Sequence, residues 1–379
     1  MPPPPATSTD LSQAQGSIGL ARAPDANADP RRHRRRLVFA VLAASLPVAL
    51  LSALWIGPMD LTLQEILGVI GARLGLTEGT GLSSVASLVV WEIRLPRALL
   101  ALVVGAGLAM AGAAMQGVFR NPLADPGIIG VATGGAVGGI VMIVLGSRLA
   151  AAADLEWFQL YLVPVGAMLG AIAITWLIYR LSLQRGQVDL VAMLLVGIAM
   201  NALGNAVIGL MIFIATDEEL RTLTFWTLGS LGRASWELIL PALLFILPAL
   251  VLLPRFARAL NALLLSEEDA QHLGVDVARS KRRLIVVAAA VVGATVALCG
   301  VIGFIALVAP HMIRVVLGPD HRYLFPASAL CGALLLLVAD LIARTIVAPA
   351  ELPVGILTAL IGAPVFLWLL LQRRRGLWT

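Results

Sequence analysis

Apolar runs of about 20 residues recur along this chain from Leu37 to Leu371, and they constrain its fold more than any other feature. A run of this length can cross the hydrocarbon core of a bilayer as a helix. A soluble domain carries about 25% charged residues, whereas this chain carries 13% and has a mean hydropathy of +0.94. The runs do not alternate in polarity, which excludes a porin-type β-barrel. The sequence therefore predicts an all-α polytopic membrane protein.

Hydropathy predicts about ten spans. We expect them at residues 37–56, 95–117, 127–147, 159–181, 189–214, 237–254, 284–303, 305–317, 324–344 and 354–371. The run 305–317 is too short for a regular membrane-crossing helix. An even number of spans places both termini on one side. With that side cytoplasmic, the 27 basic residues divide 20 inside to 7 outside, as the positive-inside rule requires.

Residues outside the spans form two predicted tails and one long loop. Residues 1–36 are rich in Pro, Ala and Ser and end in the basic run Arg31–Arg36, so we predict a disordered cytoplasmic tail. A transmembrane body then covers residues 37–372, with a cytoplasmic loop at about 255–283, and residues 373–379 form a second tail. The first apolar run is longer than a signal-peptide core, which favours an uncleaved span.

Several functional classes find no support in the sequence. The single lysine, Lys281, lies in Ser-Lys-Arg and not in the Gly-Lys-Ser/Thr of a phosphate-binding loop. Neither cysteine, Cys299 or Cys331, has metal-ligand spacing, and the four histidines lie in separate segments. We therefore expect no catalytic residue, metal or cofactor, and little support for a membrane-bound enzyme. The net charge of +5 fits cytoplasmic loops, so no nucleic-acid partner is expected.

The two halves of the chain share a weak repeat. An offset of 188 residues aligns Gly105 with Gly293, Gly112 with Gly300, and Pro122 with Pro310. Five spans separate the copies, which gives the inverted topology found in transporters. Compositional coincidence is the alternative. Polar residues and prolines at membrane depth also predict helix breaks, at Asn121, Pro122, Pro126 and Pro310.

The long loop contains the sequence LLLSEEDAQHLGVDV, which predicts a short amphipathic helix. Ser266 is a candidate N-cap with Asp269 three residues later, and Gly274 can end the helix. Leu263, Leu264 and Leu273 give it an apolar side, which favours contact with a partner over a solvated surface helix.

Four long motifs resemble the permease subunits of type II ABC (ATP-binding cassette) importers, the FecCD-type family. They are RLPRALLALVVGAGLAMAGAAMQGVFRNPLADPGIIG, FWTLGSLGRASW, SEEDAQHLGVD and GVIGFIALVAPHMIRVVLGPDHRYLFP; a fifth motif, ARTIVAPAELPVGILTALIGAPVFLWLLL, follows, and the resemblance covers about residues 37–372. It implies ten transmembrane helices in two inverted pseudo-repeats and a homodimer with the pathway at its two-fold axis. It also implies a bacterial inner-membrane location with both termini cytoplasmic. The implied partners are membrane lipid, two ATPase subunits that bind ATP and Mg, and a periplasmic substrate-binding protein.

The resemblance also implies roles for individual residues. The loop helix matches the family's coupling helix, which contacts the ATPase; its residues here are Glu267, Glu268, Ala270, His272, Leu273 and Gly274. Arg94, Arg97 and, less directly, Arg344 match arginines that receive acidic residues of the binding protein. We expect these arginines on the outer face near the dimer axis, each with a free guanidinium; anchoring to lipid phosphate is the alternative.

The substrate is the least determined feature. The motifs GPDHRYLFP and APAELPVG resemble the haem branch of the family most, with ferric siderophore and cobalamin as alternatives. An ion-coupled secondary transporter is the alternative from another class, with the intramembrane acid Asp340 as its candidate residue. Arg344 follows one turn later, so a structural ion pair between the two is the simpler interpretation.

Overall fold

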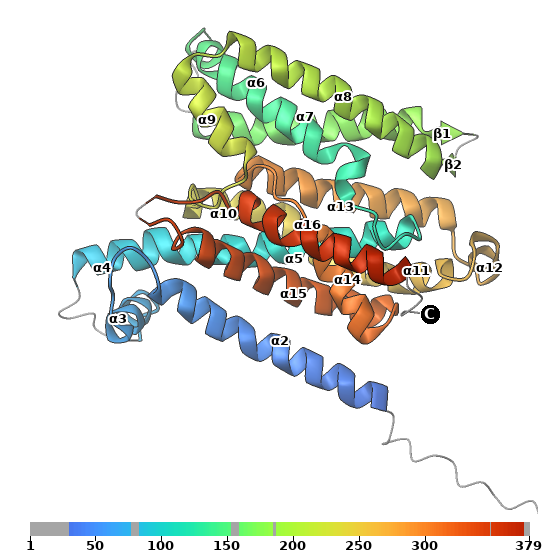
Figure 1. Ribbon diagram of the computed structural model, residues 1–379, viewed down its shortest axis with the longest axis horizontal. Coiled ribbons are helices and arrows are strands. Elements are labelled where there is room, and N and C mark those ends of the chain that lie inside the picture. The colour runs from blue at the N-terminus through green and yellow to red at the C-terminus, as the bar shows by residue number, and fades with distance from the viewer. Residues whose placement is uncertain (1–29, 77–82, 153–158, 185–186, 349, 375–379) are drawn as a thin grey trace, which may run out of the picture.

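The computed structural model describes residues 30–76, 83–152, 159–184, 187–348 and 350–374. In this part of the chain, seven helices are long and apolar enough to cross a membrane and three more are shorter but apolar. Most of them run lengthwise through the molecule (Figure 1). The ten are α2 (Pro30–Trp55), α5 (Leu95–Val118), α6 (Val131–Ala152), α7 (Gln159–Leu181), α8 (Leu190–Ile214), α10 (Trp236–Leu252), α13 (Val277–Cys299), α14 (Ile305–Leu317), α15 (His321–Ala343) and α16 (Val354–Arg374). The prediction of an all-α fold with about ten spans is confirmed.

Short elements connect these helices at the two ends of the molecule (Figure 1). One end carries α3 (Leu63–Arg73), α4 (Ser84–Leu88), the π-helical turn η1 (Val89–Arg94) and α9 (Asp217–Thr227), and we call it the α9 face. The other end carries the strand pair β1 (Leu183–Gln184) and β2 (Gln187–Val188), α11 (Ala257–Leu263) and α12 (Glu267–His272), and we call it the α12 face. The turns η2 (Pro126–Ile129) and η4 (Leu253–Phe256) complete the described elements. α2 begins and α16 ends at the α12 face, as an even number of spans requires.

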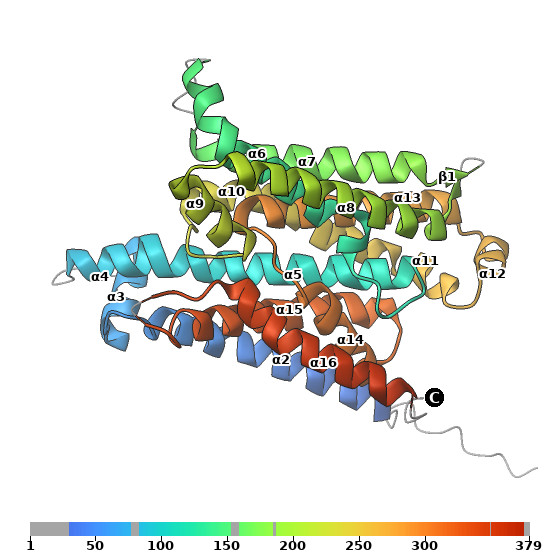
Figure 2. The same ribbon diagram turned by 45° about the horizontal axis from the view of Figure 1, so that its top comes forward.

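Helix α5 is the centre of the fold. Most of its residues are buried, and α10, α13, α14 and α15 all pack against it. Figure 2 shows α5 between a layer containing α6, α7 and α8 and a layer containing α2, α15 and α16. Glycines permit this packing: a Cβ on Gly105 would overlap the carbonyl oxygen of Gly332 in α15, and one on Gly112 would overlap that of Ala306 in α14. The small residues of α5 therefore serve close helix approach.

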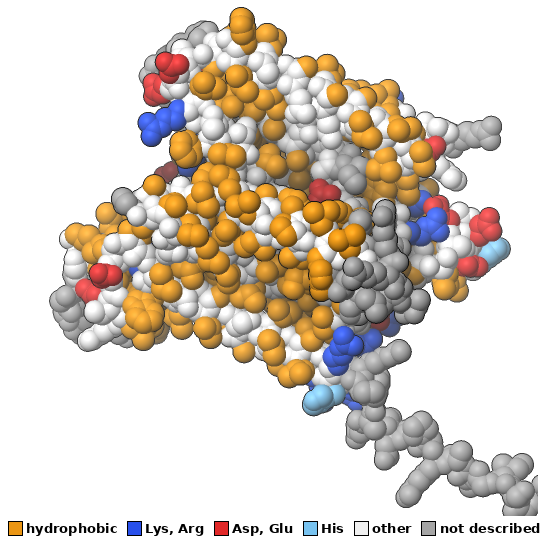
Figure 3. Space-filling view, in the orientation of Figure 1, with side chains coloured by type: hydrophobic (Ala, Val, Ile, Leu, Met, Phe, Trp, Pro, Cys, Tyr) orange, Lys and Arg blue, Asp and Glu red, His pale blue; other side chains and the backbone are white. Residues whose placement is uncertain are grey.

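Apolar side chains cover the outside of the helices, while most charged side chains gather toward the two faces (Figure 3). Helix α8 illustrates the pattern, with Leu195, Ile198 and Phe213 all exposed. A soluble protein rarely exposes an apolar surface of this extent. Lipid or further protein must cover these helices.

Two sequence predictions need correction. The basic run was expected in a disordered tail, but helix α2 begins at Pro30, so this run forms its first turns; residues 1–29 and 375–379 lie outside the described residues. Pro310 was expected to break a helix, but it lies inside the continuous helix α14. The proline leaves the carbonyl of Ala306, four residues earlier, without its helical partner. Gly112 packs directly against that carbonyl, so tertiary contact covers the defect.

The other expected breaks are present. Asn121 and Pro122 lie in the irregular segment after α5, and Pro126 begins η2. The 188-residue offset therefore aligns a proline in a loop with a proline in a helix, and it does not superpose the two breaks. Helices α5 and α13, which it also aligns, run in opposite directions between the two faces (Figure 1), as an inverted repeat requires.

Candidate functional site

The predicted loop helix is present as α12, which projects from the α12 face (Figures 1 and 2). The hydroxyl oxygen of Ser266 accepts a hydrogen bond from the backbone N–H of Asp269 at 2.9 Å, which confirms the predicted N-cap. Gly274 follows the helix with φ of +80°, and a Cβ there would meet no atom within 4 Å. Its backbone conformation, and not crowding, therefore requires glycine.

The residues of α12 divide into an inward and an outward group. Ala270 is fully buried, whereas Glu268, His272 and Leu273 are exposed. Leu273 has 66% of its surface exposed, and the preceding Leu265 has 68%. Leu263, expected on the apolar contact side, is instead buried. The outward surface of α12 is thus acidic and apolar together, a composition suited to contact with another protein.

Glu267 connects α12 to two other elements. Its Oε1 lies 2.6 Å from Nζ of Lys281, in the second turn of α13, and 3.8 Å from a guanidinium nitrogen of Arg120, just after α5. Lys281 is 5% exposed. The position of α12 is therefore coupled to the ends of α5 and α13. Sequence reasoning missed Lys281 and Arg120, because neither lies within the loop motif.

The three arginines expected to dock a binding protein lie together at the α9 face, but they are buried. Arg94 is 3% exposed and donates to the backbone carbonyls of Leu54 and Trp55 at 2.7 and 2.8 Å. Arg344 is 5% exposed and donates to the carbonyl of Ala53. Both cations thus bind the last carbonyls of α2, where the helix dipole favours positive charge.

Arg97 forms a buried ion pair with Asp340. Its Nε donates to both carboxylate oxygens of Asp340 at 3.0 Å, and its Nη1 donates to Glu351 at 2.8 and 2.9 Å. Asp340 is 1% exposed, whereas 47% of the Glu351 side chain is exposed. The expected pairing of Asp340 with Arg344 is therefore wrong, since Asp340 pairs with Arg97 and Arg344 binds α2.

These contacts correct the expected geometry of all three arginines. Each guanidinium binds groups of its own chain, and none is a free outward-facing fork. Of Arg97 and its two carboxylate partners, Asp340 and Glu351, Glu351 is the one whose side chain reaches the surface. The docking role of the arginines stays a prediction.

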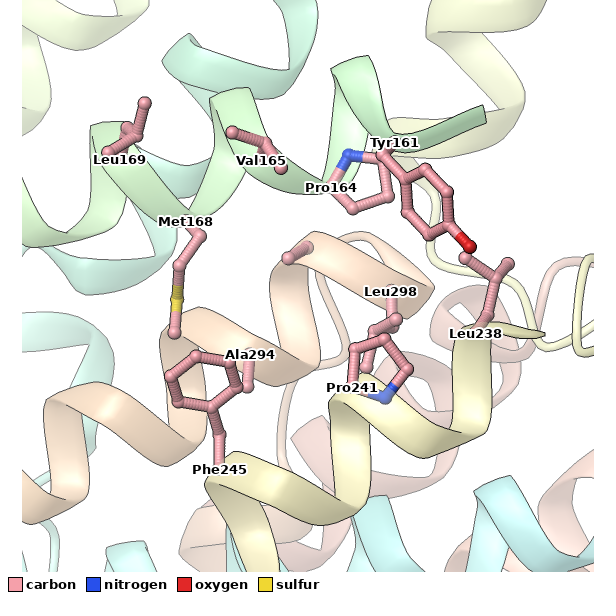
Figure 4. Close-up of a pocket in the computed structure, with 11 residues that line it drawn as sticks. Tyr161, Pro164, Val165, Met168, Leu169, Leu238, Pro241, Phe245, Ala294 and Leu298 are labelled. Carbon is pink, nitrogen blue, oxygen red and sulfur yellow. The ribbon is translucent and has the colours of Figure 1, made fainter. Parts of the chain in front are cut away.

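An apolar pocket of about 200 Å³ lies between α7, α10 and α13. Met168 of α7 and Phe245 of α10 point toward one another, and Ala294 of α13 lies beside Phe245 (Figure 4). Its walls carry no charged side chain. This pocket can hold apolar groups, but it offers no counter-charge to an anionic ligand.

A second pocket, of about 330 Å³, lies at the α9 face between α9 and the end of α13. Its walls include Arg221 and Arg233, both exposed, together with Phe225 and the largely buried Trp226. Cationic and aromatic side chains thus share one cavity. The sequence analysis quoted the motif that contains Phe225, Trp226 and Arg233, but it assigned no role to them, because one sequence does not show that they share a cavity with Arg221.

No group of three or more His, Cys, Asp or Glu side chains that could hold a metal occurs among the described residues. The ten apolar helices and the projecting α12 describe a polytopic membrane protein with a surface suited to contact with another protein. Comparison with known proteins makes this class specific.

Residues 45–372 match the FecCD transport family, and the chain belongs to that family. It is the permease subunit of an ABC importer. The hemin transport system permease protein HmuU of Yersinia pestis is 50% identical over 286 residues, which cover 75% of this chain and 84% of the relative. The vitamin B12 import system permease BtuC of Vibrio cholerae is 40% identical over 307 residues, covering 81% and 90%. A solved inward-facing metal-chelate type ABC transporter superposes with a TM-score of 0.76 at 33% identity, covering 89% of this chain and 99% of that one.

Proposed function

We propose that this permease carries haem from the periplasm to the cytoplasm. The observation that carries the proposal is the 50% identity to a hemin transport permease, against 40% and 42% for two vitamin B12 permeases. Ferric siderophore and cobalamin are the alternative substrates. The functional unit is a homodimer with two ATPase subunits and a periplasmic binding protein in the bacterial inner membrane.

The distribution of charge supports an orientation. The α12 face holds the start of α2 with its basic run and the arginines that open α13, whereas the α9 face holds few basic residues. Under the positive-inside rule the α12 face is cytoplasmic and the α9 face periplasmic. The two chain ends and α12 then lie on the side where an ATPase binds.

In this orientation α12 is the coupling helix. Its exposed Glu268, His272 and Leu273 contact the ATPase, while the buried Ala270 and the Glu267–Lys281 pair transmit its movement to α13. Nucleotide binding by the ATPases would thereby bias the permease between two conformations. No cofactor is needed in this chain.

The cationic pocket supports an anionic substrate. Haem carries two carboxylates on a flat aromatic ring, and arginine binds carboxylate through paired, charge-assisted hydrogen bonds. Arg221 and Arg233 supply two such cations beside Phe225 and Trp226. The pocket opens at the proposed periplasmic face, where substrate is released from the binding protein.

The test compares haem with its dimethyl ester, which lacks free carboxylates. Replacing both Arg221 and Arg233 with Gln should lower uptake of haem into proteoliposomes about a hundredfold or more, because charge-assisted hydrogen bonds contribute roughly 1.5–3 kcal/mol each and about 1.4 kcal/mol is tenfold. Uptake of the ester should change little. The control is Arg73→Gln, an exposed arginine at the same face but outside the pocket. An equal loss of uptake for haem and for its dimethyl ester would show that the two arginines do not bind the carboxylates of haem.

We also retain the docking proposal, in modified form. Arg97 is held by Asp340 below and Glu351 at the surface. An acidic residue of the binding protein would have to replace Glu351 on Arg97, so Glu351→Gln should strengthen docking. Unchanged docking affinity at low salt would remove Arg97 from the interface.

The ion-coupled alternative loses its candidate residue. An acid that carries protons must exchange them during transport, but Asp340 is buried against Arg97 with both oxygens bonded. Its pairing is structural. Uptake driven by a proton gradient, without an ATPase, would restore that alternative.

A further inference from the structure

A groove of about 440 Å³ opens on the α12 face beside the first turns of α2. Arg34 and Arg35 of α2 form one wall. The opposite wall consists of Asn261, Leu264 and residues 315–320, which comprise the end of α14 and the connection to α15. Nothing in the proposed transport mechanism uses this groove.

Arg35 is fixed in place at the groove. Its guanidinium carbon lies 3.9 Å from the ring centroid of Tyr323, a cation–π contact. Its Nε is buried and has no hydrogen-bond partner among the described residues. A buried donor without a partner is costly, so the site is prepared for an acceptor that the chain does not supply.

The charge around the groove is positive. The sequence from Pro30 to Met59 contains five arginines and no Asp or Glu. Asp320 is the acid that lines the groove. One of its oxygens, Oδ1, already accepts from Asn261 Nδ2 at 2.6 Å and from the backbone N–H of Arg322 at 3.0 Å.

The surroundings of Asp320 favour the ionised form of its carboxyl group. Burial raises the pKa of its carboxyl, but hydrogen bonds and the nearby charges of Arg322 and Arg35 outweigh this effect and hold the pKa below its usual range. Asp320 thus offsets one cation, and Arg34 and the rest of the basic run leave an excess.

Part of the groove is lined by apolar side chains. Val315, Val316 and Leu317 line it, together with Leu264, which is 39% exposed. Along α2 the surface continues with Leu37, Val41 and Val48, each more than half exposed. Figure 3 shows basic side chains grouped at the end of this apolar surface, where α2 begins. A cationic site thus adjoins a helix surface suited to acyl chains.

We propose that this groove binds an anionic phospholipid of the leaflet on the α12 side, with its phosphate on Arg34 and Arg35 and an acyl chain along α2. Basic clusters directly beside a membrane span attract anionic lipid headgroups. The apolar walls favour a lipid over an acidic protein segment, because they continue into the membrane-facing surface of α2. The proposal does not depend on which substrate is transported.

The test measures phosphatidylglycerol retained by the purified full-length permease in native mass spectrometry, after titration in a neutral detergent. The double variant Arg34→Gln, Arg35→Gln should weaken retention about tenfold or more. The matched control, Arg32→Gln with Arg36→Gln, removes the same charge from exposed positions of the same helix that do not line the groove. It should retain the lipid nearly as well as the unmodified protein. Arg34→Gln alone, at an exposed side chain, should show part of the loss without disturbing the Arg35–Tyr323 contact.

Four results would overturn the proposal. Equal losses in the two double variants would indicate diffuse attraction to the basic run. Equal retention of phosphatidylcholine would remove the need for a net negative headgroup. Displacement of the lipid by inorganic phosphate at the same concentration would indicate a site for free anions. Displacement by the ATPase subunits would identify the groove as a protein interface.

Discussion

Arg97 binds two carboxylates in different surroundings, and this difference predicts their energetic weight. Asp340 is buried, whereas nearly half of the Glu351 side chain is exposed. Removing one partner of a buried pair costs roughly 3–5 kcal/mol, while exposed pairs contribute about 0–1 kcal/mol. Asp340→Asn should therefore lower the unfolding free energy far more than Glu351→Gln, measured by thermal unfolding in detergent. Similar losses in the two variants would mean that the ion pair with Asp340 does not stabilise the fold.

Gly274 is predicted to matter for coupling because of its backbone. A residue with a Cβ at its φ of +80° is strained by roughly 1–2 kcal/mol, and the strain would fall on the turn between α12 and α13. Gly274→Ala should lower ATP-driven uptake while the permease stays folded. Glu268→Lys, which reverses an exposed charge of α12, should do the same.

Gly75 provides the matched control for this prediction. Its φ is +71° and its Cβ would also meet no atom, but it lies beyond α3 at the opposite face. Gly75→Ala introduces similar strain and should leave uptake unchanged. If the two alanine variants transport equally well, the turn after α12 has no part in coupling.

At the scale of the helices, the contact between α5 and α14 should tolerate no added volume. A Cβ on Gly112 would overlap the carbonyl oxygen of Ala306, so Gly112→Ala must separate the two helices. Overpacking typically costs about 1–3 kcal/mol. In Gly146→Ala the new methyl would sit at 3.6 Å from its nearest neighbours, an ordinary contact distance. Thermal unfolding should separate the two variants; equal midpoints would contradict the close packing of α5 and α14.

The helices themselves could be predicted from the sequence, because hydropathy depends on each segment alone. The predicted spans 159–181 and 305–317 match α7 and α14 residue for residue. The short helices α3 and α9 were missed, since each has 11 residues and is too short to cross a membrane. Their capping boxes, Thr62 with Glu65 and Thr216 with Glu219, were the available signal.

The partners of individual residues were less predictable. Spacing along one helix suggested that Asp340 pairs with Arg344, but the structure brings Arg97 from another helix to the carboxylate. Likewise, the sequence predicted a helix break at Pro310, but α14 continues through it, and Gly112 packs against the carbonyl of Ala306 that the proline leaves without a helical partner. Both errors have the same cause, since contacts between distant segments decide the outcome and one sequence does not display them. The motif-based prediction of α12 succeeded because its cap and its terminating glycine are local.

At the scale of the whole molecule, the chain is one component of a larger machine. It belongs to a family of transport permeases, and its sequence contains no phosphate-binding loop. In the proposed function the energy for transport comes from a partner ATPase, for which the projecting α12 is the proposed contact. In the proposed function, specificity is shared between the binding protein and the cationic pocket of the α9 face.

The most direct test of the central claim is haem uptake by proteoliposomes that contain the permease with its two ATPase subunits. Haem-loaded binding protein is supplied outside, and internal haem is measured with and without ATP inside. The account predicts accumulation only with ATP and with all three components, and no competition by an excess of cobalamin-loaded binding protein from a vitamin B12 system. Accumulation that follows a proton gradient without the ATPase, or transport of cobalamin in preference to haem, would contradict it.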